Sequence, residues 1–175
     1  AHQLGLIHRD IKPSNILVEQ VEGQGFVPFV TDFGLARETA APQLTQTGTI
    51  TGTPQYMSPE QARGSAALLD RRTDVYSLGA TLYELLTGRP PFTGGSALEV
   101  LLQVVESDPP RVRHIAPEVP EDLETIVLKC MDKEPGRRYE SARALAEDLQ
   151  RYLSGDPIIA RPASLLTGMF WRFGS

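Results

Sequence analysis

Apolar residues follow two different periods along this chain. Residues 16–18 and 26–31 are short runs rich in β-branched and aromatic side chains, and a glycine-rich stretch at 23–25 separates them. Short apolar runs on either side of such a turn indicate a β-hairpin. The first run, Ile-Leu-Val, is suited to a buried strand. The pattern therefore predicts one small hairpin near the start of the chain.

From residue 73 onward the apolar residues recur at helical spacing. The longest segment runs from Thr73 to Thr87, where Gly88 and Pro90 end it, and we expect it to be the central helix. Proline-rich joints separate three further amphipathic segments. The four apolar stripes are Val75, Leu78, Leu82, Leu85 and Leu86; Leu98, Leu101, Leu102 and Val105; Leu123, Ile126, Val127 and Cys130; and Leu145, Ala146, Leu149 and Leu153. The predicted fold is mainly α, a helical bundle that carries one small β-hairpin.

The composition fits a single intracellular domain. The chain has 175 residues, of which 41% are hydrophobic, enough for one buried core. Its one cysteine, Cys130, cannot form an intramolecular disulfide, and its place in an apolar stripe indicates core packing. A net charge of −5 without a long basic run argues against nucleic acid as the main partner. The single cysteine favours a reducing, cytoplasmic location. No apolar run reaches the roughly 18 to 20 residues needed to cross a bilayer, so we expect the chain as given to be soluble.

Candidate chemistry is concentrated around the predicted hairpin. Residues 8–15, HRDIKPSN, offer the carboxylate of Asp10, the cation of Lys12 and the amide of Asn15 just before the first strand. A second carboxylate, Asp32, follows the second strand, so one hairpin can bring these groups to a common site. A base that orients a hydroxyl, a cation for developing charge and two oxygen ligands for magnesium are the equipment for phosphoryl transfer.

Several segments in the correct order resemble those of protein kinases. HRDIKPSN and the DFG at residues 32–34 are similar to the catalytic loop and the metal-binding turn, and the Lys-Pro pair is typical of serine/threonine kinases. GTPQYMSPE at 52–60 resembles the end of the activation loop, and DVYSLG at 74–79 resembles the central-helix motif. The chain resembles the C-terminal lobe of a bacterial, Hanks-type serine/threonine kinase over roughly residues 1–155.

The resemblance implies an ATP- and Mg²⁺-dependent enzyme that phosphorylates Ser or Thr hydroxyls of proteins. It implies that Asp10 orients the acceptor hydroxyl, that Lys12 neutralises charge on the transferring group, and that Thr53 helps to receive the acceptor. Leu17 corresponds to the residue beneath the adenine. Lys12, Asn15 and Asp32 are the further ATP-site residues, the last two as magnesium ligands.

Other residues have structural or regulatory roles by the same resemblance. His8 and Phe33, followed by Gly34, match an apolar stack, and Glu60 is expected to form a buried ion pair with Arg138. Asp74 would accept hydrogen bonds from the catalytic-loop backbone, although a carboxylate near a helix start is also simply a cap.

The segment from 35 to 53 has no apolar period and is predicted to be a loop. Thr45 and Thr47 resemble paired activation-loop phosphoacceptors, and a phosphate there could pair with Arg9. The alternative is a solvated loop that is never phosphorylated.

The ends of the sequence suggest a fragment. No glycine-rich loop or paired strand lysine of the ATP-clamping upper lobe is found, so the isolated chain is expected to have little or no activity. We expect residues 1–155 to form the lobe and 156–175 a C-terminal tail. The tail is either a juxtamembrane linker of a membrane-anchored parent or a segment packed on the lobe. The alternative function is a catalytically silent kinase-like lobe that binds proteins.

Overall fold

The computed structural model describes residues 6–33 and 53–160. The predictions for Gly34, Thr45, Thr47 and most of the tail lie outside these residues. The elements in chain order are η2 (Pro13–Asn15), β1 (Ile16–Val21), β2 (Gly25–Val30), η3 (Pro54–Tyr56), α1 (Pro59–Ala62), η4 (Ala66–Leu68), α2 (Arg71–Thr87), α3 (Ala97–Glu106), α4 (Val112–Ile115), α5 (Glu121–Cys130), η5 (Pro135–Arg137) and α6 (Ala142–Ser154), where η marks a 3₁₀ turn. The predominance of helix in the described residues confirms the predicted mainly α class.

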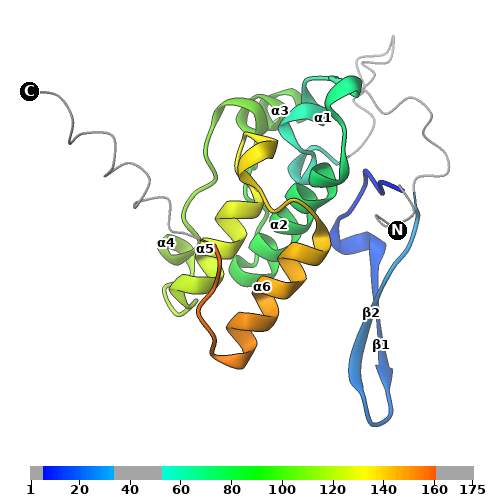
Figure 1. Cartoon of the computed structure of the whole chain (residues 1–175). Helices are drawn as coiled ribbons and strands as arrows, with labels where there is room; N and C mark the ends of the chain where they lie inside the picture. Colours follow the sequence, from blue (N-terminus) through cyan, green and yellow to red (C-terminus); the bar gives the residue numbers. More distant parts are fainter. Residues whose placement is uncertain (1–5, 34–52, 161–175) are drawn as a thin grey trace, which may run out of the picture.

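The predicted hairpin is present. Strands β1 and β2 pair antiparallel from Ile16 opposite Val30 to Val21 opposite Gly25, and Gly23 and Gly25 take the positive φ values that the turn requires. The expected burial of the first strand is wrong, because Leu17 and Val18 are 59% and 61% exposed. Within the described residues the sheet has only these two strands, and the hairpin projects beside the helices (Figure 1).

Helix α2 runs through the middle of the helical part, with α5 and α6 packed along it (Figure 1). The Asp70 side chain caps its first turn by accepting from the Arg72 N–H, and Gly88 ends it in the left-handed conformation. Two core clusters share this helix. The first contains Tyr76, Ala80, Tyr83, Phe92, Val100, Val104, Val112 and Val127, and the second contains Val75, Ile126, Cys130, Tyr139, Leu145 and Ala160.

The predicted leucine stripe of α2 is wrong in part. Leu85 is 70% exposed, whereas Thr73, Ser77 and Thr81 are buried. The buried hydroxyls are tolerated because they donate to carbonyls: Ser77 Oγ lies 2.8 Å from the Tyr56 oxygen, and Thr81 Oγ1 lies 2.9 Å from the Ser77 oxygen. A helix covered on most sides does not need to show a single apolar face.

The stripe predicted in α5 is buried at Ile126, Val127 and Cys130, but those of α3 and α6 are displaced. In α3 the buried positions are Val100, Leu101 and Val104, while Leu98 and Leu102 are exposed. Almost every position from 97 to 105 is apolar, so the sequence does not fix which side faces the core. In α6 the expected Ala146 and Leu153 are likewise exposed.

The chain beyond α6 turns back along α5 (Figure 1). Its backbone is bonded to the buried side chain of Asp148. Asp148 accepts from the N–H groups of Ile159 and Ala160 at 2.5 and 2.9 Å and from the Tyr139 hydroxyl at 2.6 Å. We call this arrangement the C-terminal clamp. It brings Ala160 into the second core cluster, with Ile158 packed against it, so these two residues of the predicted tail contact the helices. None of the described helices combines the length and the apolar character needed to cross a lipid bilayer.

Candidate active site

The loop before the hairpin is held by a carboxylate from α2. Asp74 accepts from the backbone N–H groups of His8 and Arg9, both at 2.8 Å, one to each oxygen. Arg9 has a φ of 67°, a left-handed conformation that is unfavourable for a residue with a side chain. Two charge-assisted hydrogen bonds offset that strain. Asp74 is also buried, so it does more than cap the first turn of its helix.

His8 connects the same loop to the end of the hairpin. Its Nδ1 accepts from the Asp10 N–H at 3.2 Å, and its Nε2 lies 2.8 Å from the Thr31 oxygen. Because Nδ1 accepts, Nε2 carries the proton, and the ring is neutral in this arrangement. The ring centroids of His8 and Phe33 are 4.7 Å apart. The two members of the expected stack are therefore in contact.

Asp10, Lys12 and Thr53 meet at the candidate catalytic position. The Lys12 ammonium lies 3.1 Å from Asp10 Oδ2 and donates to Thr53 Oγ1 at 3.2 Å. Thr53 is 43 positions from Asp10 in the sequence, and the Lys12 side chain bridges them. The Asn15 amide nitrogen donates to Asp10 Oδ2 at 3.2 Å and to the Asp10 carbonyl at 2.8 Å. The carboxylate is thus fixed through one oxygen.

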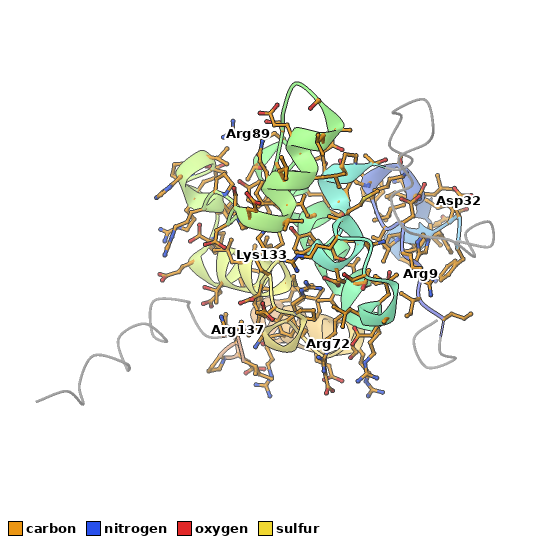
Figure 2. The ribbon with its side chains drawn as sticks, turned by 90° about the horizontal axis from the view of Figure 1, so that it is seen from above. Arg9, Asp32, Arg72, Arg89, Lys133 and Arg137 are labelled. Carbon is orange, nitrogen blue, oxygen red and sulfur yellow. The ribbon has the colours of Figure 1, made fainter. Side chains whose placement is uncertain are left out.

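Asn15 and Asp32 fit a magnesium ion by the chemistry of their donors. The Asn15 nitrogen donates to Asp10, and among the described residues no hydrogen bond is made to its side-chain carbonyl oxygen, which is the acceptor of that amide. The main chains of Asn15 and Thr31 are joined by a 2.9 Å hydrogen bond from the Thr31 N–H to the Asn15 backbone carbonyl oxygen, and Asp32 follows directly. Asp32 is exposed, as is Leu17 on β1, and Figure 2 shows Asp32 and Arg9 on the same side of the molecule. Amide and carboxylate oxygens are the ligands that Mg²⁺ prefers.

The expected pair of Glu60 and Arg138 is buried and bidentate. The two side chains, 3% and 0% exposed, are joined by bonds of 2.8 and 2.9 Å. Arg138 also donates to the carbonyl oxygens of Asp132, Arg72 and Lys133 at 2.7, 3.1 and 3.2 Å, so all five guanidinium N–H groups are used. Burial raises the pKa of Glu60, but the bonds to Arg138 outweigh it, and the pKa lies below its usual value.

Gln61, which was not among the residues predicted from the sequence, links this pair to the loop. Its amide nitrogen donates to the Arg9 carbonyl at 2.8 Å. Gln61 also forms a reciprocal capping box with Ser58 at the start of α1. A Ser followed three residues later by Gln is a recognised helix-start pattern, so that signal was available. The contact of the Tyr56 hydroxyl with Glu84 carries no comparable signal in the sequence.

Comparison with known proteins identifies the family. The family model of the protein kinase domain matches residues 1–149. The chain belongs to the protein kinase family. Serine/threonine-protein kinase PknB of Mycobacterium tuberculosis is 47% identical over 161 residues, which is 90% of this chain and 24% of that protein. PknB of Mycobacterium leprae is 48% identical over 160 residues, and serine/threonine-protein kinase PrkC of Bacillus subtilis is 41% identical over 156.

The kinase domain match extends over the loop, the hairpin and every helix up to most of α6. It includes Asp10, Lys12 and Thr53, which the fold brings together from two distant segments. The chain spans about a quarter of the length of the curated relatives it matches.

Proposed function

We propose that this chain is the C-terminal lobe of a serine/threonine protein kinase that transfers the γ-phosphate of ATP to protein hydroxyls. The observation that carries the proposal is the Lys12 bridge between the Asp10 carboxylate and the Thr53 hydroxyl. An ion pair that only stabilised the fold would need Lys12 and Asp10 alone. The additional bond from Lys12 to the Thr53 hydroxyl is what a site that receives an acceptor hydroxyl requires. The names of PknB and PrkC as serine/threonine-protein kinases support the same acceptor class.

Asp10 is the group that positions the acceptor hydroxyl. Its Oδ2 is bonded to Lys12 and Asn15, and no described residue makes a hydrogen bond to its Oδ1. An acceptor hydroxyl can donate to Oδ1 without displacing the bonds that fix the carboxylate. Catalysis of phosphoryl transfer rests mostly on such positioning and on charge stabilisation. Lys12 supplies the positive charge that stabilises the transferring phosphoryl group. Thr53 accepts a hydrogen bond from the Lys12 ammonium and so holds it next to Asp10.

Asn15 and Asp32 would hold Mg²⁺ through side-chain oxygens, and Leu17 would lie beneath the adenine of ATP. The metal, when bound, supplies charge neutralisation for the phosphates. The exposure of Leu17 and Asp32 leaves them accessible to a nucleotide. The contribution of this chain is to set the two ligands on either side of one hairpin, where the bond from Thr31 to Asn15 fixes their spacing.

The test is phosphate transfer by the complete gene product that contains this chain. Purified protein, ATP, Mg²⁺ and a generic protein substrate should yield phosphoserine or phosphothreonine in the substrate. Asp10→Asn should lower the rate by about 10²- to 10⁴-fold, the range expected for loss of a positioned acid–base group. Asp122→Asn, at an exposed position in the first turn of α5, is the matched control and should leave the rate unchanged.

The same assay examines the isolated 175 residues, for which we expect little or no transfer. A gene product that transfers no phosphate, or an Asp10→Asn variant as active as the parent, would refute the kinase proposal. The chain would then be treated as a kinase-like lobe that binds proteins.

A further inference from the structure

Lys133 joins α3 to the turn that precedes Arg138. It lies between α5 and η5, and its ammonium donates to the Val104 carbonyl at 2.7 Å. Val104 is in the last turn of α3, where helix carbonyls lack partners within the helix. A positive charge at the C-terminal end of a helix is also favoured by the helix dipole. Lys133 therefore caps α3 from outside that helix.

The same ammonium contacts two aromatic rings of the first core cluster. It lies 4.6 Å from the ring centroid of Phe92 and 5.9 Å from that of Tyr76. The Arg138 guanidinium lies 5.0 Å from the same Tyr76 ring. Cations within about 6 Å of an aromatic centroid are attracted by the ring. Tyr76 is thus shared by two cations from the segment between α5 and α6.

The main chain of Lys133 continues these contacts toward the candidate active site. Its carbonyl oxygen accepts from Arg138 at 3.2 Å, and Arg138 binds Glu60. Glu60 is followed by Gln61, which bonds to the Arg9 carbonyl in the loop. One continuous series of bonds therefore runs from the end of α3 to the loop that holds Asp10. In Figure 2 Lys133 lies among the helices, with Arg9 and Asp32 together at one side.

We propose that Lys133 is a positioning residue that fixes α3 and Phe92 against the Glu60–Arg138 pair and thereby orders residues 53–61 beside the catalytic loop. The effect on catalysis rests on the proposed kinase function, but the ordering does not. The position needs a cation with a long stem, because it must reach the Val104 carbonyl and face two rings at once. A neutral apolar residue would fill the space without capping α3.

The electrostatic surroundings of Lys133 add a pH dependence. Burial lowers the pKa of Lys133 to about 8; Asp108 opposes that shift, Arg138 and Arg63 add to it, and Asp132 opposes it. Above that pH the neutral amine can still donate to the Val104 carbonyl, but it loses the attraction to the rings. The ordering effect of Lys133 should therefore weaken as the pH rises through about 8.

The test is hydrogen–deuterium exchange by mass spectrometry on the complete gene product, which does not depend on activity. Lys133→Met should lower protection about 2- to 30-fold in peptides covering residues 53–61 and the end of α3, the range seen for residues that couple distant sites. Lys133→Arg keeps the charge and should restore most of the protection. Lys129→Met is the matched control, because the Lys129 ammonium lies 4.9 Å from the Tyr139 ring but outside this series of bonds.

A pH series keeps the test decisive if Lys133→Met does not fold. Between pH 7 and 9, protection factors of residues 53–61 should fall in the parent and stay level in Lys133→Arg. The proposal is overturned if Lys133→Met changes only α3, if Lys129→Met has the same effect on residues 53–61, or if the parent and Lys133→Arg have the same pH dependence. If the parent transfers phosphate, Lys133→Met should raise the KM for the protein substrate and leave that for ATP unchanged. A parent without activity would refute the kinase proposal and leave the exchange result to decide this one.

Discussion

Replacing Arg138 with lysine keeps the positive charge but removes the planar fork that the site uses. The guanidinium makes five hydrogen bonds, two to Glu60 and three to backbone carbonyls around it. A lysine ammonium has three donors at a single point and cannot reach acceptors on several sides. At least two buried acceptors would lose their partners.

The expected cost follows from those lost bonds. Each buried acceptor left without a donor costs about 1 to 3 kcal/mol, so two of them cost about 2 to 6 kcal/mol. Breaking a buried ion pair from one side costs about 3 to 5 kcal/mol, which agrees. We therefore expect Arg138→Lys to lower the free energy of unfolding by about 3 to 5 kcal/mol. In a domain of this size that corresponds to a fall of about 6 to 20 °C in Tm.

Urea denaturation followed by far-ultraviolet circular dichroism measures this difference. Arg143→Lys is the control, because Arg143 forms an exposed pair with Glu147 on α6 and its replacement should change stability by less than about 0.5 kcal/mol. A double-mutant cycle with Glu60→Gln and Arg138→Met should give a coupling energy toward the upper end of about 0.5 to 3 kcal/mol. A cost below about 1 kcal/mol for Arg138→Lys, or additive effects in the cycle, would refute the reasoning.

The same pair predicts a pH dependence of stability. The pKa of Glu60 in the folded state lies below its ordinary value of 4.5, so the unfolded chain binds more protons in the range between the two values. The contribution of the pair is complete above about pH 4.5 and is lost as the pH falls through the folded-state pKa. The Arg138→Met variant should therefore show a shallower loss of stability in acid than the parent.

Three further changes test separate contacts. Asp74→Asn keeps the shape but can accept only one of the two loop N–H bonds, so it should cost about 1 to 3 kcal/mol and expose the loop to faster hydrogen exchange. Gly79→Ala should destabilise by about 1 to 3 kcal/mol instead of stabilising the helix, because an added Cβ would lie 2.5 Å from that of Cys130; a gain in urea midpoint would contradict the close packing of α2 on α5. Asp148→Asn should release residues 156–160 to limited proteolysis and reduce the acid sensitivity of the fold, since the bonds to Asp148 lower its pKa despite its burial; unchanged cleavage would show that the clamp does not hold this segment.

The local pattern of the sequence predicted the elements better than their exposed and buried faces. The apolar runs and the glycine turn placed both strands of the hairpin, and Gly88 marked the end of α2 correctly. The hydrophobic pattern did not predict the buried positions of a helix such as α2, which is covered by neighbouring elements on more than one side. Ser77 is buried because it can bond to carbonyls within and beside its own helix, which hydrophobicity does not register. Leu17 is exposed because nothing in the described part of the chain covers the two-stranded sheet at that position, and strand composition alone cannot reveal what covers a strand.

The candidate site was predicted from motifs, and the fold adds how the motifs meet. The sequence supplied Asp10, Lys12 and Thr53 as separate members, and the structure brings them within hydrogen-bonding distance. The sequence marks Gln61 as a helix-start residue, but it does not show that Gln61 bonds to the Arg9 carbonyl or which carbonyls Arg138 binds, because bonds to backbone atoms leave little trace in residue identity. Thr45 and Thr47 stay predictions.

The C-terminal clamp has a mechanical consequence. A force applied to the chain beyond Ala160 reaches the two backbone bonds to Asp148 before it reaches the turns of α6. While these bonds hold, tension or torque at residue 160 is transmitted to the helical core through Asp148 and Tyr139. Once they break, residues 156–160 can extend under load, and the end of the chain can move without displacing the helices. Whatever is attached beyond this point is therefore mechanically connected to the kinase fold only up to the rupture force of the clamp.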